Sequence, residues 1–217
     1  MADRTFLSLE PQIAPSVPGC PAPTIETYVR AAAIEVCERT QAWRHQQDDI
    51  TLVAGTHSYA YVTPTGSEVC GITHMALNGN KINFVTQEEL HDCYPDWPST
   101  DTTKRSRPQI VSQFHPDNFI VAPVPDSAET YTMKMFLVLR PTPASTGMEE
   151  IVFDELERVI VHGALQRMLV LPDRSWTDND LAGYHAKQFS YRLASRRAKA
   201  SLGLGRASLS VQMNPLT

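Results

Sequence analysis

Two pairs of cysteine and histidine are the residues that could bind a metal ion. Cys70 and His74 stand four positions apart in an expected strand, and His91 and Cys93 lie near an expected turn. Zinc sites commonly take their ligands from closely spaced pairs such as CxxC, and the sequence has no such pair. Along a strand, Cys70 and His74 would lie about 13 Å apart on one face. We therefore expect no metal ion and no other cofactor.

Groups for nucleophilic or acid–base catalysis are present, but they form no recognisable pattern. No serine stands in a GxSxG nucleophile elbow. Gly203-Leu204-Gly205 lacks the lysine and the following helix of a phosphate-binding loop. Five carboxylates crowd the expected start of a long helix: Glu149, Glu150, Asp154, Glu155 and Glu157. The helix macrodipole is sufficient to explain them, so we predict no catalytic residues and no enzyme activity.

The charges are sharply separated along the chain. All 24 acidic residues lie at or before Asp180, so residues 1–180 carry a formal charge of −11. The remaining 37 residues carry six basic side chains: Lys187, Arg192, Arg196, Arg197, Lys199 and Arg206. Cations near the end of a helix are favoured by the macrodipole, which is one explanation for three of them. The absence of carboxylates favours a second one, a docking segment for an acidic partner.

Length and composition are those of a globular protein. The chain has 217 residues, of which 42% are hydrophobic and 20% are charged, so it can bury a substantial core. No apolar run approaches the roughly 18 residues of a membrane span, and the first residues lack the apolar core of a signal peptide. We expect a protein that is assembled in the cytoplasm, contacts no membrane and keeps its four cysteines as free thiols.

The predicted fold class is α+β, with helices on either side of a strand-rich region. Residues 1–23 contain five prolines and are expected to form an extended N-terminal arm. Thr24 is the expected N-cap of a first helix, whose apolar positions from Ile25 to Trp43 recur at helical spacing. Residues 144–202 should contain two further helices, about Met148–Leu171 and, after a Thr177/Asp180 capping box, a last helix to about Leu202 with Gly203 as its C-cap.

Between the helices, residues 48–143 are expected to form an antiparallel β domain. Asn78-Gly79 is a strong hairpin signal between the strands 69–77 and 81–85. Thr86 and Glu89 should form a capping box for one short helix. Strands are also expected at 50–53, 58–62, 109–114, 119–121 and 130–139. The complete prediction is a three-helix bundle of residues 24–47 and 144–202, an inserted antiparallel sheet domain of residues 48–143, and extended N- and C-terminal arms, the latter at 203–217.

Several landmarks then follow in an order that resembles the head-to-tail adaptor (connector) proteins of tailed bacteriophages. They are CERTQAW at the end of the first helix, VCGITHMALNGNKINFVTQEELHDCYPDW, RPQIVSQFHPDNFIVAPVP, LRPTP, VHGALQRML and YHAKQF. The resemblance covers roughly residues 20–204. Matching landmark positions, namely Trp43, Trp97, Pro123, Pro125 and Gly163, are interpreted as packing and turn residues.

The resemblance implies a virion structural protein at the head–tail junction. Such proteins form a ring, typically of twelve copies, between the portal protein and a tail tube, tail hub or nozzle protein, and they leave a passage for double-stranded DNA during genome ejection. It also implies a C-terminal arm that docks on the portal. The expected docking residues are Arg196, Arg197, Lys199, Leu204, Arg206, Leu209, Val211 and Met213.

Two alternatives remain from other functional classes. One is a small cytoplasmic enzyme that uses the sheet as a pocket, which requires convergent titratable side chains. The other is a nucleic-acid-binding module that uses the basic end of the chain, whose DNA affinity would fall steeply with salt.

Overall fold

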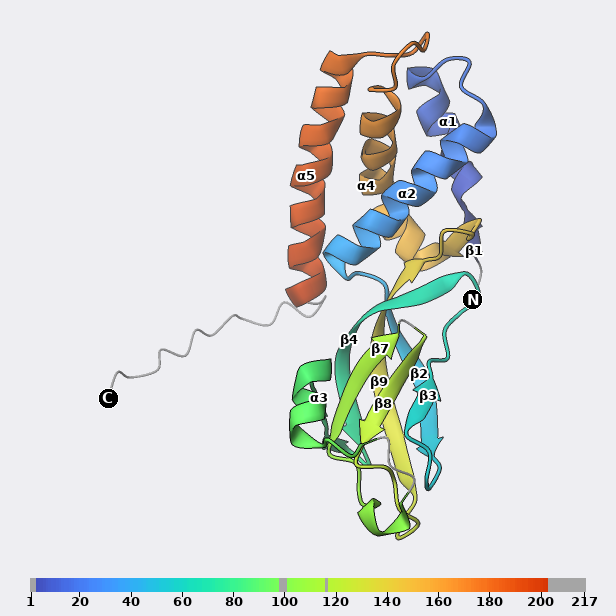
Figure 1. The fold of residues 1–217 in the computed structure, drawn as a ribbon. Helices are drawn as coiled ribbons and strands as arrows, with labels where there is room; N and C mark the ends of the chain where they lie inside the picture. Colours follow the sequence, from blue (N-terminus) through green and yellow to red (C-terminus); the bar gives the residue numbers. More distant parts are fainter. Residues whose placement is uncertain (1–2, 98–100, 116, 203–217) are drawn as a thin grey trace, which may run out of the picture.

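The protein is elongated, with a helical part at one end and two β-sheets at the other (Figure 1). The computed structural model describes residues 3–97, 101–115 and 117–202. Within these residues, α-helices and mainly antiparallel sheets confirm the α+β class. The prediction of three helices is incomplete, because the described residues contain five α-helices, two of them short.

The N-terminal segment is folded against the helices. Strand β1 (Asp3–Thr5) pairs with β10 (Gly147–Glu149), and helix α1 (Glu10–Ile13) lies between the 3₁₀ turns Phe6–Leu9 and Ala14–Ser16. The prediction of an extended arm over 1–23 is therefore wrong for the described residues. Prolines sit in the first turns of α1 and of the second 3₁₀ helix, where no backbone N–H is needed. Four apolar residues of this segment are buried: Phe6, Leu9, Ile13 and Val17.

Helix α2 (Ala22–Thr40) is shorter at its C-terminal end than predicted. It begins after Pro21, so Thr24 is not its N-cap. It ends because Gln41 adopts the left-handed conformation, with φ of 53°. Strand β2 (Arg44–Leu52) follows almost directly, which places residues 44–47 in the sheet and corrects the predicted boundary at 48. Trp43 is buried as the spacing indicated, but it lies between the two elements.

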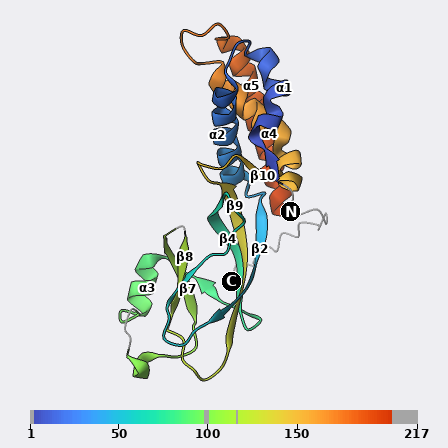
Figure 2. The ribbon, with the colours of Figure 1, turned by 90° about the vertical axis from the view of Figure 1, so that its right-hand side faces the viewer.

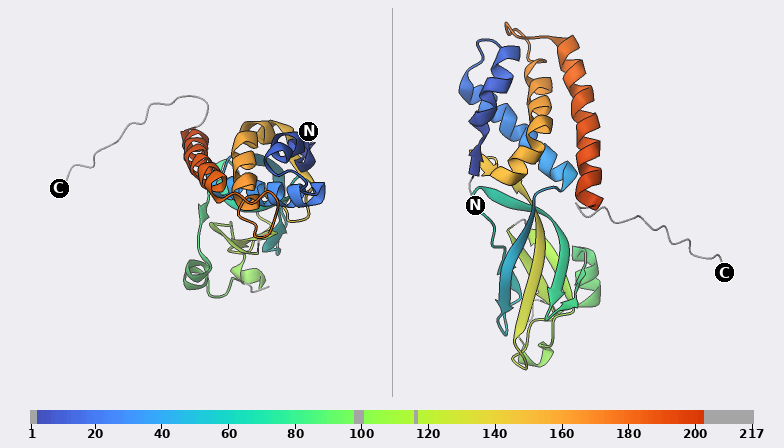
Figure 3. Two further views of the ribbon diagram at one scale, coloured as in Figure 1. Left: turned by 90° about the horizontal axis from the view of Figure 1, so that it is seen from above. Right: turned by 180° about the vertical axis from the view of Figure 1, so that it is seen from behind.

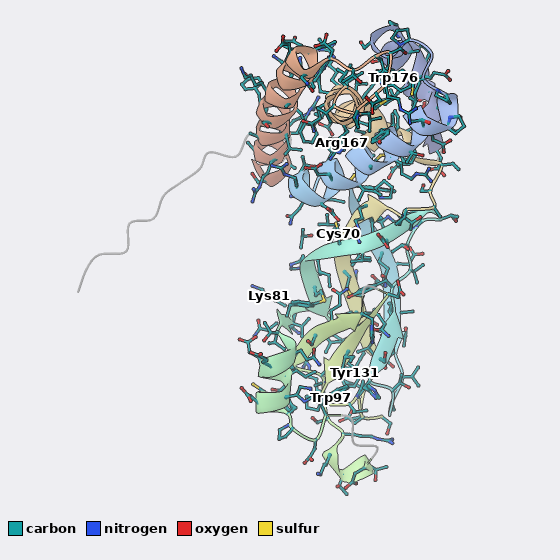
Figure 4. All side chains as sticks on the ribbon, turned by 45° about the horizontal axis from the view of Figure 1, so that its top comes forward. Cys70, Lys81, Trp97, Tyr131, Arg167 and Trp176 are labelled. Atoms are coloured by element: carbon teal, nitrogen blue, oxygen red, sulfur yellow. The ribbon has the colours of Figure 1, made fainter. Side chains whose placement is uncertain are left out.

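Helices α2, α4 (Glu150–Met168) and α5 (Asn179–Leu202) pack against one another. They approach closely at Gly163 of α4, where an added Cβ would lie 2.8 Å from a ring carbon of Phe189 and 3.0 Å from the Cβ of Ala32. Arg167 of α4 donates a hydrogen bond to the Gly163 carbonyl oxygen (2.6 Å) and forms an ion pair with Glu35 of α2. Figure 4 shows Arg167 among the helices of the bundle. Gly163 is thus a packing residue, as interpreted from the sequence.

The strand-rich region forms two four-stranded sheets, which lie on opposite sides in Figure 2. The first sheet has the order β2, β9 (Tyr131–Pro141), β4 (Ser67–Leu77) and β5 (Asn80–Lys81). The second has the order β3 (Ser58–Ala60), β8 (Asn118–Ala122), β7 (Ile110–His115) and β6 (Asn83–Phe84). All pairs are antiparallel except β6 with β7, which is parallel, so the prediction of a purely antiparallel domain needs this correction.

Two local predictions in this region are confirmed. The β4–β5 hairpin turns at Asn78 and Gly79, which both have positive φ angles, as the residue types require. Helix α3 (Gln87–Cys93) begins with the capping box of Thr86 and Glu89. A 3₁₀ turn (Thr102–Lys104) completes the described elements.

The helical part is joined to the sheets at a narrow region around Trp43, Arg140 and Glu149, which we call the waist. The Trp43 indole donates a hydrogen bond to the Glu149 carboxylate (3.0 Å), and the Leu139 amide donates to the Trp43 carbonyl oxygen (2.8 Å). Arg140 of β9 forms ion pairs with Glu38 of α2 and Glu68 of β4. These contacts connect helix α2 and strand β10 to strands β4 and β9 around the buried Trp43.

The Gly163 contact can be tested against a second helical glycine. We expect Gly163→Ala to lower the free energy of unfolding by about 1 to 2 kcal/mol, because the new methyl group must displace Phe189 or Ala32. Gly183→Ala in α5 should raise it by about 0.5 to 1 kcal/mol, because no described atom outside the adjoining helix backbone lies within 4 Å of the added Cβ and alanine favours a helix. Urea unfolding of both variants gives the measurement. An equal stabilisation by the two substitutions would show that Gly163 is not a tight contact.

Candidate docking surface

Helix α5 carries three of the residues expected to dock, and its start is set by Asp178. The Asp178 carboxylate accepts a hydrogen bond from the Leu181 amide (2.9 Å). The predicted capping box of Thr177 and Asp180 is therefore wrong, since the helix begins at Asn179 and Thr177 instead bonds to the Leu171 carbonyl oxygen. Asp178 offered the same N-cap chemistry one residue later, and spacing alone did not distinguish the two.

Among the described side chains of α5, one stripe is buried against its own chain. This stripe consists of Ala182, His185, Phe189 and Leu193, at the spacing of one helix face. Much of the rest of this 24-residue helix faces solvent, including Tyr184 (54% exposed) and Tyr191 (76% exposed). Figure 3 shows α5 at the outer edge of the helical part. A long helix with so little burial presents a large surface to other molecules.

The basic residues at the end of α5 differ in their partners. Arg196 and Lys199 both form ion pairs with Glu155 of α4 (3.0 and 2.5 Å). Arg197 points to the other side of α5, where it lines a groove with Glu38 and Gln41, and no ion pair of Arg197 is found within the described part of the chain. Of the three cations predicted to dock, Arg196 and Lys199 are therefore paired with Glu155, whereas Arg197 is available to a partner.

The remaining predicted docking residues lie outside the described residues: Leu204, Arg206, Leu209, Val211 and Met213. The same holds for Gly203, the predicted C-cap. The end of α5 that leads to them is attached to the waist, because Arg44 of β2 donates a hydrogen bond to the Ala200 carbonyl oxygen (2.6 Å).

A pair of histidines connects α5 to α4, and the sequence analysis did not identify it. The Nδ1 atoms of His162 and His185 lie 2.8 Å apart, so one ring donates a hydrogen bond to the other when both are neutral. Burial, together with the nearby His185 and Arg192, lowers the pKa of His162 to about 4. Burial also lowers the pKa of His185. The two residues are 23 positions apart on different helices, so no local spacing could have revealed the pair.

The carboxylates at the start of α4 have partners that the macrodipole argument missed. Arg4 of β1 forms ion pairs with Asp154 and Glu157, and Gln12 also donates to Glu157. These contacts fasten the N-terminal segment to α4. They join residues about 150 positions apart, which explains why the local sequence gave no signal.

The described residues contain no group of three or more histidine, cysteine, aspartate or glutamate side chains placed to hold a metal ion. None of the described helices is long and apolar enough to cross a membrane. The four cysteines are free, as predicted. Burial raises the pKa of the Cys37 thiol far above its ordinary value, which keeps this side chain protonated and unreactive at neutral pH.

Comparison with known proteins identifies the family. A family model described as SU10 adaptor protein matches residues 4–213, nearly the whole chain, and the chain therefore belongs to the SU10 adaptor protein family. This membership makes it a structural adaptor protein of a phage and confirms the resemblance found in the sequence. A search of curated proteins found no match.

The histidine pair should make the protein sensitive to acid. Because the folded state lowers both pKa values, the unfolded chain binds more protons between pH 6.5 and about 4. The free energy of unfolding should therefore fall as the pH falls through this range. Replacing both residues, as His162→Gln with His185→Gln, should reduce this fall, whereas His115→Gln at an exposed position should leave it unchanged. Unfolding midpoints in urea from pH 7 to 4 measure the effect. The same pH dependence of the midpoint in the unsubstituted protein, the double variant and the control would contradict it.

Proposed function

We propose that this adaptor forms a ring between the portal protein and the tail of the virion. The ring contains about twelve copies and leaves a central passage for double-stranded DNA during genome ejection. Family membership supports the adaptor role. The ring, its copy number and its position at the head–tail junction are our inference from the resemblance and from the surface of the molecule.

The observation that carries the proposal is the exposure of α5. A helix of 24 residues with a single buried stripe is poorly covered by its own chain, and two exposed tyrosines lie seven positions apart on it. Burial of helix surface between neighbouring copies would contribute roughly 25 cal/mol per Å² of apolar area before the costs of association. Repetition of one heterologous contact closes a ring when the rotation between copies allows it.

The charge distribution supports the assignment of partners. We infer that the basic end of the chain, with Arg197 and the residues 203–217, docks on the portal protein. The end of α5 that carries Arg197 lies beside the waist, between the helical part and the sheets (Figure 1), so the tail tube, hub or nozzle protein would bind another face of the molecule. A body with a charge of −11 is unsuited to hold DNA tightly, which favours a passage that contacts DNA without sequence specificity.

The proposed ring predicts the number of adaptor copies in each particle. Purified particles should contain about twelve copies of this chain for each portal ring, because the adaptor is expected to follow the symmetry of the portal. Cryo-electron microscopy of the head–tail junction, or quantitative mass spectrometry of particles against the portal protein, provides the measurement. The chain as a monomer in solution is compatible with assembly on the portal, but a monomer in complete particles would exclude the ring.

A truncated protein tests the docking arm. Deletion of residues 203–217 should change the free energy of unfolding by less than about 0.5 kcal/mol, because α5 is already anchored by its buried stripe and by Arg44. Attachment to DNA-filled heads that lack the adaptor should fall sharply, since the deletion removes Arg206 and apolar side chains that include Leu204, Leu209, Val211 and Met213. Sedimentation of heads with the full-length and the truncated protein measures attachment. Normal attachment of the truncated protein would remove the docking role, and loss of folding would assign the segment to the core.

A further inference from the structure

A groove between α4 and α5 has features that ring closure and the C-terminal arm do not explain. The two helices lie side by side in the right panel of Figure 3 and touch at Gly163 and Phe189. Toward the waist, a groove of about 460 Å³ lies between residues 154–159 of α4 and residues 191–196 of α5. Its volume is sufficient for a few side chains of another molecule.

The carboxylates in this groove are already neutralised within the chain. Asp154 and Glu157 pair with Arg4. Glu155 pairs with Arg196 and with Lys199. These acidic groups therefore require no external cation.

Two arginines of the groove lack such partners. Neither Arg158 nor Arg192 forms an ion pair with any residue of the described ranges, although both line the groove. The Nε atom of Arg192 is buried and has no hydrogen-bond partner among the described residues. A guanidinium remains charged at all physiological pH values and presents several donors in one plane. The groove and its ion pairs contain three carboxylates and five cations, namely Arg4, Arg158, Arg192, Arg196 and Lys199. This excess of positive charge suits the groove to bind an anion.

Exposed apolar side chains flank the same groove. Tyr191 lines it, and Ile151 stands seven positions before Arg158 on the same face of α4. They are the most exposed large hydrophobic residues of the described chain, at 76% and 73%. Arginine and tyrosine at the centre of a protein surface are the residue types that dominate binding energy in protein–protein interfaces.

We propose that this groove binds an acidic segment of another protein in the particle, whose carboxylate accepts hydrogen bonds from Arg158 and Arg192. An apolar side chain of the same segment then packs on Tyr191 and Ile151. Carboxylates match the planar guanidinium in a two-bond geometry. A groove of about 460 Å³ between two helices admits a few side chains but not a DNA duplex, which disfavours DNA as the occupant. The inference rests on the proposed function only in that the partner is a protein of the assembled particle.

A photo-crosslinker at the groove tests the inference without knowledge of the partner. Tyr191 is replaced by p-benzoylphenylalanine in the full-length protein, particles are assembled and irradiated, and mass spectrometry identifies the attached peptide. We expect a peptide of a protein other than the adaptor, with Asp or Glu at or beside the cross-linked position. Arg158→Gln and Arg192→Gln, singly and together, should reduce the yield, by about tenfold or more for the double variant.

The matched control is Lys187→Gln, which removes a positive charge from the same helix without lining the groove; its yield should change less than about twofold. Thermal unfolding of each variant confirms that the fold is retained. The inference is overturned if cross-links form only to adaptor peptides, to DNA or to a peptide without acidic residues. An unchanged yield in the double arginine variant also overturns it. Absence of the adaptor from particles overturns the proposed function, whereas incorporation without the expected cross-link overturns only the groove.

Discussion

The close packing of α4 between α2 and α5 is the constraint on which the helical part depends. Gly163 leaves no space for a side chain between Ala32 and Phe189. At the same level Arg167 bonds to the Gly163 carbonyl oxygen, pairs with Glu35 and lies 5.9 Å from the Phe189 ring centroid. One arginine thus satisfies its charge, covers an aromatic ring and connects three helices. Such a tight centre allows α5 to be held by one stripe while most of its surface remains free.

This arrangement has consequences at the end of the helical part that meets the sheets. Toward the waist, Glu155, Arg196 and Lys199 bridge α4 and α5, and Arg44 attaches α5 to the sheet domain. From the N-terminal segment, Arg4 binds Asp154 and Glu157 of α4 and fastens that segment to the helix. The bundle and the sheets are therefore connected by charged and hydrogen-bonded contacts around Trp43, which favours a fixed relation between the two ends of the elongated molecule.

The sequence predicted the parts of this fold that depend on local chemistry. The Asn78-Gly79 hairpin and the Thr86 capping box were correct because neighbouring residues determine them. The N-terminal segment was misjudged, because its prolines were interpreted as signs of an arm although they fit the first turns of short helices. The end of α2 was also missed, since the buried Trp43 fits helical spacing equally well after a left-handed Gln41.

In the candidate docking surface, too, the sequence predicted local features but not the contacts between distant residues. The cations of α5 were predicted from the charge pattern, but their partners were not. Glu155 lies more than 40 positions from Arg196 and Lys199, and the His162–His185 pair joins two helices. Contacts of this kind depend on the relative placement of helices, which residue spacing does not specify. The distinction between the engaged Arg196 and the available Arg197 therefore required the structure.

The central claim is that the outer face of α5 is buried only when the adaptor assembles. Hydroxyl-radical footprinting measures this directly through the oxidation of Tyr184 and Tyr191 in the isolated protein and in complete particles. The account predicts rapid oxidation of both tyrosines in the isolated protein, where they are 54% and 76% exposed, and strong protection of at least one of them in particles. Equal oxidation of both residues in the two states would contradict it, because α5 would then remain a free surface in the virion.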